Sequence, residues 1–125
     1  MESKKIGDRG EQIACRILEK EGYCVTQRNY HSRFGEIDII AENEHYLAFI
    51  EVKTRTESSR TLPREAVGFS KQRKIALTAM NYLQTNIAEK TPVFDVLEIL
   101  YCNDGTIKYN HIKSAFDISC LGGNY

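Results

Sequence analysis

Two consecutive runs of β-forming residues constrain the fold of this chain more than any other feature. The runs GEIDIIAEN (35–43) and HYLAFIEVKTR (45–55) are rich in Ile, Val and Phe, and only a short polar turn around Glu44 separates them. Runs of this composition, joined by a short turn, predict an antiparallel β-hairpin. The fold must therefore hold these two strands side by side.

The hairpin carries charged side chains among its apolar ones. Because side chains alternate along a strand, Glu36 and Asp38 share one face of the first strand, and Glu51 and Lys53 share one face of the second. A two-residue turn at 44–45 would place Asp38 opposite Glu51 and Glu36 opposite Lys53. Glu-His is not a favoured turn, so slipped registers stay open: one residue of slip would separate these groups, and two would keep them together.

Two helices are predicted on either side of this hairpin in the sequence. Apolar residues at helical spacing, Asp8 as N-cap and Gly22 as stop predict a first helix from Arg9 to Glu21. A second helix is predicted to open at Ser70, with basic residues in its first turns. Those residues oppose the helix dipole, which favours anions at that end, and a phosphate ligand would relieve the strain.

Three more strands complete the predicted order. They span 23–30, 92–102 and 106–116, and the last two are joined at Asn103-Asp104-Gly105, a strong hairpin signal. The stretch 56–65 is polar and rich in breakers, which predicts a mobile loop. The order α-β-β-β-α-β-β predicts an α/β domain with a mixed sheet. With 125 residues the chain has room for a single domain, 1–125, ending in a frayed tail at 119–125.

The net charge of zero hides a local separation of charge. Residues 35–51 carry five carboxylates and no Lys or Arg, whereas residues 53–74 carry seven basic and two acidic residues, a net +5. The N-terminus has no apolar stretch typical of a signal peptide, and no window approaches the ~18 apolar residues of a membrane span. We therefore expect a cytoplasmic protein with no membrane partner.

The paired carboxylates predict a divalent metal. Opposed carboxylates on neighbouring half-buried strands repel each other unless a positive charge lies between them. Oxygen ligands without Cys or His favour Mg²⁺ or Mn²⁺ over zinc. A cross-strand ion pair, in which Lys53 neutralises Glu36 and Glu51, is the simpler alternative for an isolated Glu-x-Lys.

The pattern Asp38, then Glu51-Val52-Lys53, resembles the PD-(D/E)xK superfamily of restriction-endonuclease-like nucleases. Ile37 stands where the superfamily name has a proline, at a position that commonly varies. The fuller set GDRGEQIA, GYCVTQRNY, GEIDIIA, FIEVKTR and FDV resembles the bacterial YraN-like family, which is regarded as related to archaeal Holliday junction resolvases. The resemblance implies a restriction-endonuclease-like core with a central mixed sheet flanked by helices.

The resemblance also implies roles for particular residues. Asp38 and Glu51 would ligate the metal together with the Val52 carbonyl, and Lys53 would either deprotonate the attacking water or stabilise charge. Glu11 matches a helix glutamate that completes the metal site in resolvase-like members. Asp8-x-x-Glu11 is equally a capping box, in which the carboxylate only serves the helix start. Glu36 and Asp95 are candidates for contacts that support the ligands, although a structural role is the simpler interpretation of Asp95.

Basic residues around this centre are candidates for contacts with phosphates of a nucleic acid, and each alone is equally explained by solubility. They are Arg55, Arg64, Lys71, Arg73 and Lys74. We expect a Mg²⁺- or Mn²⁺-dependent nuclease acting on DNA rather than RNA, on branched or linear substrates. The alternative is a nucleic-acid-binding module without efficient catalysis. Because resolvase-like relatives are often dimers, the resemblance also allows a homodimer.

Overall fold

The computed structural model describes residues 2–58, 67–87 and 89–117, with side chains from Arg9 onward. Its elements follow the predicted order α-β-β-β-α-β-β. They are α1 (Glu2–Lys20), β1 (Cys24–Ser32), β2 (Gly35–Glu42), β3 (Tyr46–Thr56), α2 (Phe69–Thr85), β4 (Thr91–Tyr101) and β5 (Ile107–Phe116). The predicted loop at 56–65 lies mostly, and the predicted tail at 119–125 wholly, outside the described residues.

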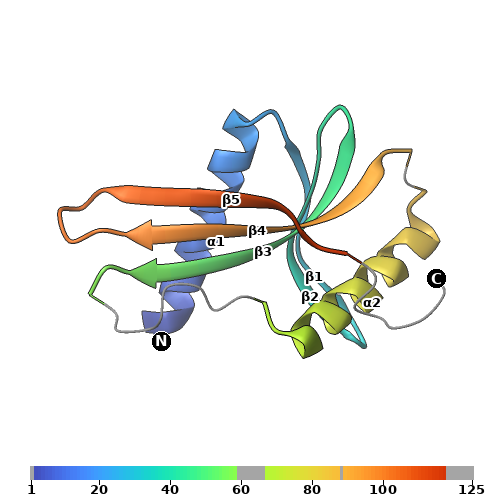
Figure 1. Cartoon of the computed structure of the whole chain (residues 1–125), viewed down its shortest axis with the longest axis horizontal. Helices are drawn as coiled ribbons and strands as arrows, with labels where there is room; N and C mark the ends of the chain where they lie inside the picture. Colours follow the sequence, from blue (N-terminus) through green and yellow to red (C-terminus); the bar gives the residue numbers. More distant parts are fainter. Residues whose placement is uncertain (1, 59–66, 88, 118–125) are drawn as a thin grey trace.

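The strands form one mixed sheet in the order β1-β2-β3-β4-β5 (Figure 1). All neighbours are antiparallel except β3 and β4, which run parallel. Parallel neighbours need a crossover connection, and here the chain that contains α2 provides it. The predicted mixed sheet is confirmed.

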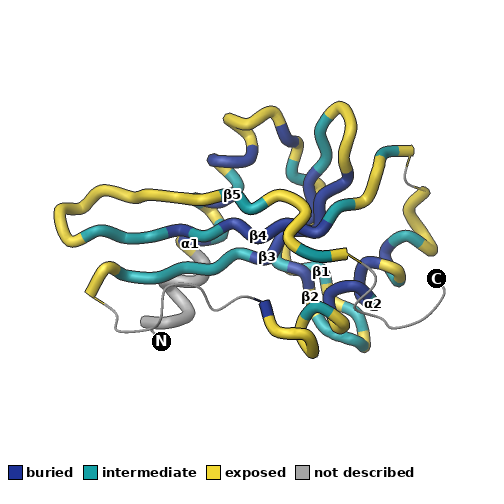
Figure 2. The backbone as a smooth tube through the Cα atoms, in the orientation of Figure 1, coloured by how far each residue is buried: buried dark blue, intermediate teal, exposed yellow. Residues whose placement is uncertain are grey.

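The two helices pack on opposite faces of the sheet, as the alternation of β3 shows. Leu47 and Phe49 belong to a buried cluster with residues of α2, whereas Ala48 and Ile50 belong to a cluster with residues of α1. The sheet centre is therefore covered twice, and the buried segments concentrate there (Figure 2). The outer ends of β4 and β5 extend past both helices; the outer part of β5 is exposed, whereas that of β4 is half-buried to buried.

The β2–β3 hairpin has the predicted register, from Ile39 opposite Ile50 to Glu42 opposite Leu47. The Glu-His turn is stabilised from outside the two turn residues. The Asn43 N–H donates to the Tyr46 carbonyl at 3.0 Å, and the Asn43 side-chain oxygen accepts from the N–H groups of His45 and Tyr46. An Asx turn of this kind explains how an unfavoured pair of turn residues is accommodated.

The start of α1 differs from the prediction. The helix begins at Glu2 and not at Arg9, so Asp8 lies inside it and is not an N-cap. The capping-box interpretation of Glu11 is therefore wrong. The predicted end is close: α1 ends at Lys20, and Gly22 adopts a positive φ of 96°. The second helix begins at Phe69 with Gly68 as its N-cap, one residue before the predicted Ser70.

Candidate active site

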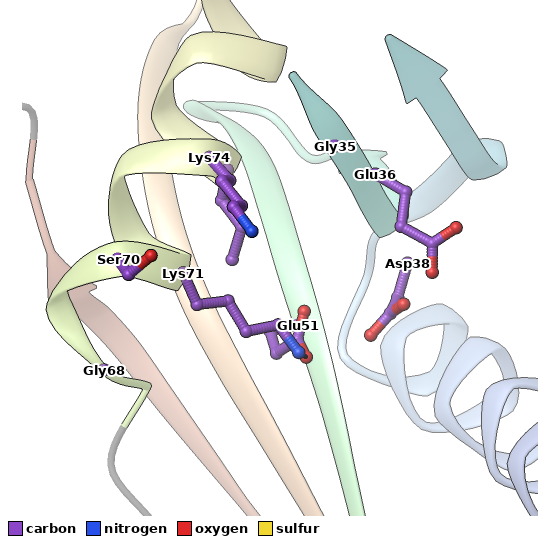
Figure 3. A pocket seen from close by; sticks show the side chains of 9 residues that line it. Gly35, Glu36, Asp38, Glu51, Gly68, Ser70, Lys71 and Lys74 are labelled. Carbon is purple, nitrogen blue, oxygen red and sulfur yellow. Dashed lines mark ion pairs between the residues drawn. The ribbon is translucent and has the colours of Figure 1, made fainter. Parts of the chain in front are cut away.

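A cavity of about 480 Å³ lies between the β2–β3 hairpin and the start of α2. Its two walls carry opposite charge: carboxylates project from β2 and β3, and lysines from α2 (Figure 3). The lining residues are Gly35, Glu36, Asp38, Glu51, Gly68, Ser70, Lys71, Lys74 and Ile75. The acidic and the basic stretches of the sequence therefore meet in one pocket.

Asp38 lies where β2 separates from β3. The register would place Asp38 opposite Glu51, but the paired stretch ends one residue earlier, at Ile39 and Ile50. In place of a backbone carbonyl, the Asp38 Oδ2 atom accepts the hydrogen bond of the Val52 N–H at 2.8 Å. The side chain thus completes the sheet and is held in one position.

A local irregularity of the neighbouring strands accompanies this separation. Ile37 packs in the cluster on the α2 side and Ile39 in the cluster on the α1 side, so β2 changes the face it presents across Asp38. On β1, Asn29 lies between the partners of these two residues and has a left-handed φ of 51°. Strict alternation could not predict this change of face.

The environment of Asp38 favours its neutral form. Burial and the charge of Glu51 raise the pKa of Asp38 from 3.8 to about 7, although the hydrogen bond from Val52 opposes the shift. Glu11 adds to the raising effect and Lys71 offsets part of it. Such strong perturbation in a pocket is typical of functional carboxylates.

Glu51 is the most buried carboxylate of the pocket, with 6% of its side chain exposed. Its Oε1 atom lies 2.6 Å from the Lys71 ammonium nitrogen. Burial alone would lower the pKa of Lys71, but the hydrogen bond to Glu51 and the nearby carboxylate charges raise it, so Lys71 is cationic. The sequence predicted Lys71 as a phosphate contact and gave no sign that it pairs with Glu51.

Glu11 approaches the same region from α1. Its side chain is 15% exposed, and its buried Oε1 atom has no hydrogen-bond partner among the described residues; the nearest cation is Arg28, at 3.6 Å. The helix α1 lies so close to β3 that a Cβ at Gly10 would collide with Thr54. This close contact brings Glu11 to the region of the pocket. A buried carboxylate oxygen without a hydrogen bond is rare and calls for a ligand or a functional reason.

The donors in this pocket and beside it fit a divalent metal in kind. Asp38, Glu51 and Glu11 offer hard carboxylate oxygens, which Mg²⁺ and Mn²⁺ prefer. Within the described part of the chain, however, no three His, Cys, Asp or Glu side chains are gathered closely enough to hold a metal ion. The carboxylates therefore do not form a finished cage, and the ammonium of Lys71 lies against one of them.

The other predicted site residues lie around the pocket. Lys53 is half-buried on β3 in register with Glu98, outside the pocket lining, and Glu36 pairs with His31 at 3.3 Å. The predicted pairing of Glu36 with Lys53 is absent from the β2–β3 register. Arg55 lies 3.8 Å from Glu98.

The predicted phosphate contacts differ in their relation to the cavity. Lys71 and Lys74 line it. Arg73 is exposed on the first turns of the same helix but is not among the lining residues. Arg64 lies outside the described residues.

Asp95 is buried on β4 outside the pocket lining, in a separate cluster with His111 and Glu21. Its Oδ2 atom is 2.7 Å from the Nε2 atom of His111, and its Oδ1 atom accepts the Ser114 N–H. The other ring nitrogen of His111 is 2.7 Å from a Glu21 oxygen. The sequence assigned no role to His111, since the three residues come from separate elements and follow no motif.

The chain is similar in sequence to several known proteins. Residues 10–99 match the model of the uncharacterised protein family UPF0102. A UPF0102 protein from Caldanaerobacter subterraneus subsp. tengcongensis is 42% identical over 117 residues, which cover 90% of this chain and 95% of that protein. A UPF0102 protein from Clostridioides difficile is 38% identical over 117 residues, which cover 93% of this chain and 100% of that protein. No helix among the described residues is long and apolar enough to cross a membrane.

Proposed function

The chain belongs to the UPF0102 family, and from the geometry of its pocket we propose that it is a Mg²⁺- or Mn²⁺-dependent nuclease that hydrolyses phosphodiester bonds in DNA. One observation carries the proposal: half-buried Asp38 and buried Glu51 face two lysines of α2 across one cavity. A metal on the acidic wall and a phosphate on the basic wall would balance both charges.

The acidic wall favours a cation on energetic grounds. Asp38, Glu51 and Glu11 are all largely or partly buried, and buried carboxylates are costly unless they are paired and hydrogen-bonded. Lys71 compensates one of them directly. A divalent ion held by Asp38 and Glu51, with Glu11 and the Val52 carbonyl as further donors, would compensate the rest.

The residues in and beside the pocket suit hydrolysis of a phosphodiester. A bound divalent metal supplies Lewis-acid polarisation and a lowered pKa of water. Asp38 is fixed by the Val52 N–H, so its remaining oxygen is presented in a defined direction. Lys53, two residues beyond Glu51, would either accept a proton from the attacking water or stabilise the developing charge. Lys71 and Lys74 would bind the phosphate oxygens.

The element order and the mixed sheet are consistent with a restriction-endonuclease-like core, and we propose membership of the PD-(D/E)xK superfamily and kinship with Holliday junction resolvases. Branched DNA is then the favoured substrate. Cutting two symmetric strands needs two centres, so we also propose that the active species is a homodimer, acting in the cytoplasm.

Purified protein should be incubated with single-stranded, duplex and four-way-junction DNA, in Mg²⁺, in Mn²⁺ and in EDTA. We expect metal-dependent cleavage that Glu51→Gln lowers at least about a hundredfold, because an essential ligand is lost. Glu44→Gln, on the exposed turn of the same hairpin, is the matched control and should retain activity. Circular dichroism must show that both variants are folded. Metal-independent cleavage, or full activity of Glu51→Gln, would contradict the proposal.

A second candidate is a nucleic-acid-binding module without catalysis. The ion pair of Glu51 with Lys71 and the lack of a gathered three-carboxylate site among the described residues favour it. It predicts salt-dependent binding without turnover or a metal requirement, weakened by Arg73→Ala and Lys74→Ala. Binding that persists unchanged in EDTA, with no cleavage in any metal, would favour this function over the nuclease.

A further inference from the structure

The ion pair between Lys71 and Glu51 joins the two walls of the pocket. Its atoms are 2.6 Å apart, a distance typical of a strong charge-assisted hydrogen bond. The carboxylate is 6% exposed, whereas the lysine side chain is 50% exposed. The glutamate is therefore held by the sheet, and the lysine is the partner that is free to move.

The lysine reaches Glu51 from the third residue of α2, and its aliphatic stem spans the cavity (Figure 3). Long, flexible stems of this kind let the charged end change position without repacking the core. If the ammonium left Glu51, it would remain at the basic wall beside Lys74 and the start of α2. Anions are stabilised at that end of a helix, and this first turn contains no acidic residue that would repel them.

One ammonium is a poor match for the acidic wall. Glu51 shares the pocket with Asp38, and the nearby Glu11 retains a buried oxygen without a hydrogen bond among the described residues. A divalent cation carries twice the charge and accepts several oxygen ligands at once. It would therefore displace the ammonium from Glu51 once its free concentration is sufficient.

We propose that Lys71 is an exchange residue: without metal it is the counter-ion of Glu51, and when metal binds it moves to a phosphate of the nucleic acid. This inference rests on the proposed function and deepens it. Metal and lysine compete for Glu51, and the lysine released by the metal becomes available to the substrate. Metal loading and substrate binding are thereby coupled through one side chain.

The first half of the inference is tested by calorimetric titration with Mn²⁺ at pH 8, without nucleic acid. Lys71→Met keeps the stem and removes the competing charge, so we expect Mn²⁺ to bind at least about fivefold more tightly than to the wild type. Lys71→Gln, which leaves Glu51 a neutral hydrogen-bond donor, should show the same direction. Lys71→Gln replaces Lys71→Met in this test if circular dichroism shows that Lys71→Met does not fold.

Lys74→Met is the matched control, because it removes one positive charge from the same wall one turn further along α2. Its effect measures the general electrostatic gain for a cation. If Lys71→Met binds Mn²⁺ no more tightly than Lys74→Met does, there is no competition for Glu51 and the inference is overturned.

The second half predicts a change of opposite sign. With saturating Mn²⁺ on each protein, binding of a fluorescent DNA four-way junction should weaken severalfold in Lys71→Met, and the slope of log K against log salt should fall by about one phosphate contact. If Lys71 were merely structural, its substitution would weaken the binding of both Mn²⁺ and the junction. Tighter Mn²⁺ binding with unchanged junction affinity would overturn the exchange.

The tests separate this inference from the proposed nuclease. Tighter Mn²⁺ binding by Lys71→Met with no binding of any DNA by any of the proteins would support the competition for Glu51 but contradict the nuclease, and with it the transfer of Lys71 to a phosphate. Cleavage that depends on Glu51, together with Mn²⁺ affinity unaffected by Lys71→Met, would support the nuclease and overturn the exchange.

Discussion

Asp38 serves the fold and the proposed chemistry through different atoms. Its Oδ2 atom replaces a backbone acceptor for the Val52 N–H at the point where β2 leaves β3. Its charge, however, is disfavoured by burial and by Glu51, which together raise its pKa to about 7. The shape of the side chain therefore stabilises the sheet while its ionisation destabilises it.

This conflict predicts a stabilising substitution. Folding raises the pKa of Asp38 above its ordinary 3.8, so the folded state binds the proton more tightly and the free energy of unfolding falls as pH rises from about 4 to 7. Asp38→Asn keeps an acceptor for Val52 and removes the charge. In EDTA at pH 8 we expect it to raise the free energy of unfolding by about 2 kcal/mol, with little effect at pH 4. Urea denaturation at both pH values measures this, and a destabilised variant at pH 8 would contradict it.

His111 shows the opposite dependence on protonation. Burial alone would lower its pKa, but hydrogen bonds with Asp95 and Glu21, together with their charges, raise it. A charged imidazole donates through both nitrogens and satisfies both carboxylates, whereas a neutral one donates through only one. The bridge therefore holds β5 to β4 and to the end of α1 in the protonated form.

A raised histidine pKa stabilises the fold below pH 6.5, and this contribution is lost as pH rises through the folded value. We expect His111→Gln to lower the free energy of unfolding by about 3 kcal/mol at pH 6, because Asp95 is left buried and incompletely paired. The difference in the free energy of unfolding between His111→Gln and the wild type should be smaller at pH 9. His45→Gln, at an exposed histidine, is the control and should show no such narrowing. An equal deficit at both pH values would show that the bridge does not depend on protonation.

Among single residues, local pattern predicted the carboxylates but not their partners. Asp38 and Glu51 were recognisable because charges in apolar strands are unusual, and the pair meets in one pocket. The partnership of Glu51 with Lys71, and the cluster of His111, Asp95 and Glu21, join residues far apart in the chain. Side-chain contacts of this kind follow from tertiary packing, which one sequence does not specify.

At the scale of elements, the contact between α1 and β3 decides where Glu11 lies. Gly10 is buried, and a methyl group in its place would collide with the Thr54 side chain. The helix therefore approaches the strand more closely than an alanine would allow. The absence of a side chain at Gly10 sets the depth at which the next residue, Glu11, enters the site.

Gly10→Ala should therefore destabilise the protein although alanine favours helices. Overpacking typically costs ~1–3 kcal/mol, against a gain in helix propensity of ~1 kcal/mol, so we expect a net loss of about 1 kcal/mol. Thr54→Ser removes the methyl group in the way, and the double variant should recover the loss. Thermal denaturation of both single variants and the double variant measures this coupling. An additive double variant would show that the two sites do not touch.

Elements were predicted well where periodicity and turn chemistry are local. The second hairpin closes at the predicted turn, where Gly105 has a φ of 86° and Asp104 accepts from the Thr106 N–H. The β2–β3 register is the one that a two-residue turn implies, among the registers that the sequence left open. The start of α1 was not predicted correctly, because Asp8 resembles an N-cap while the helix continues through it. A favourable N-cap residue does not fix the start of a helix when the residues before it can also be helical.

For the whole molecule, zero net charge and a charged pocket imply short-range recognition. Long-range steering of DNA scales with the overall field, which is small here. Binding must then depend on contacts made inside and around the pocket. For the proposed nuclease, local structure in the nucleic acid, and not total charge, would bring the substrate to the site.

We therefore expect weak, salt-sensitive binding to plain duplex DNA, with a dissociation constant of about 10⁻⁶–10⁻⁴ M at physiological salt. Fluorescence anisotropy of a labelled duplex over a range of salt concentrations measures both the affinity and its slope. A four-way junction with the same base composition is the matched comparison and should bind more tightly. Nanomolar binding to the plain duplex would contradict this view of the molecule.

The parallel pairing of β3 with β4 also separates the two walls of the pocket in the order of folding. The acidic wall comes from β2 and β3, which are consecutive in the chain, whereas α2 joins them as the crossover from β3 to β4 closes. Distant segments associate more slowly than adjacent ones because the entropy of loop closure must be overcome first. We therefore expect the carboxylates to meet before the lysines arrive, so that ions from solvent supply their early counter-charge in a refolding chain.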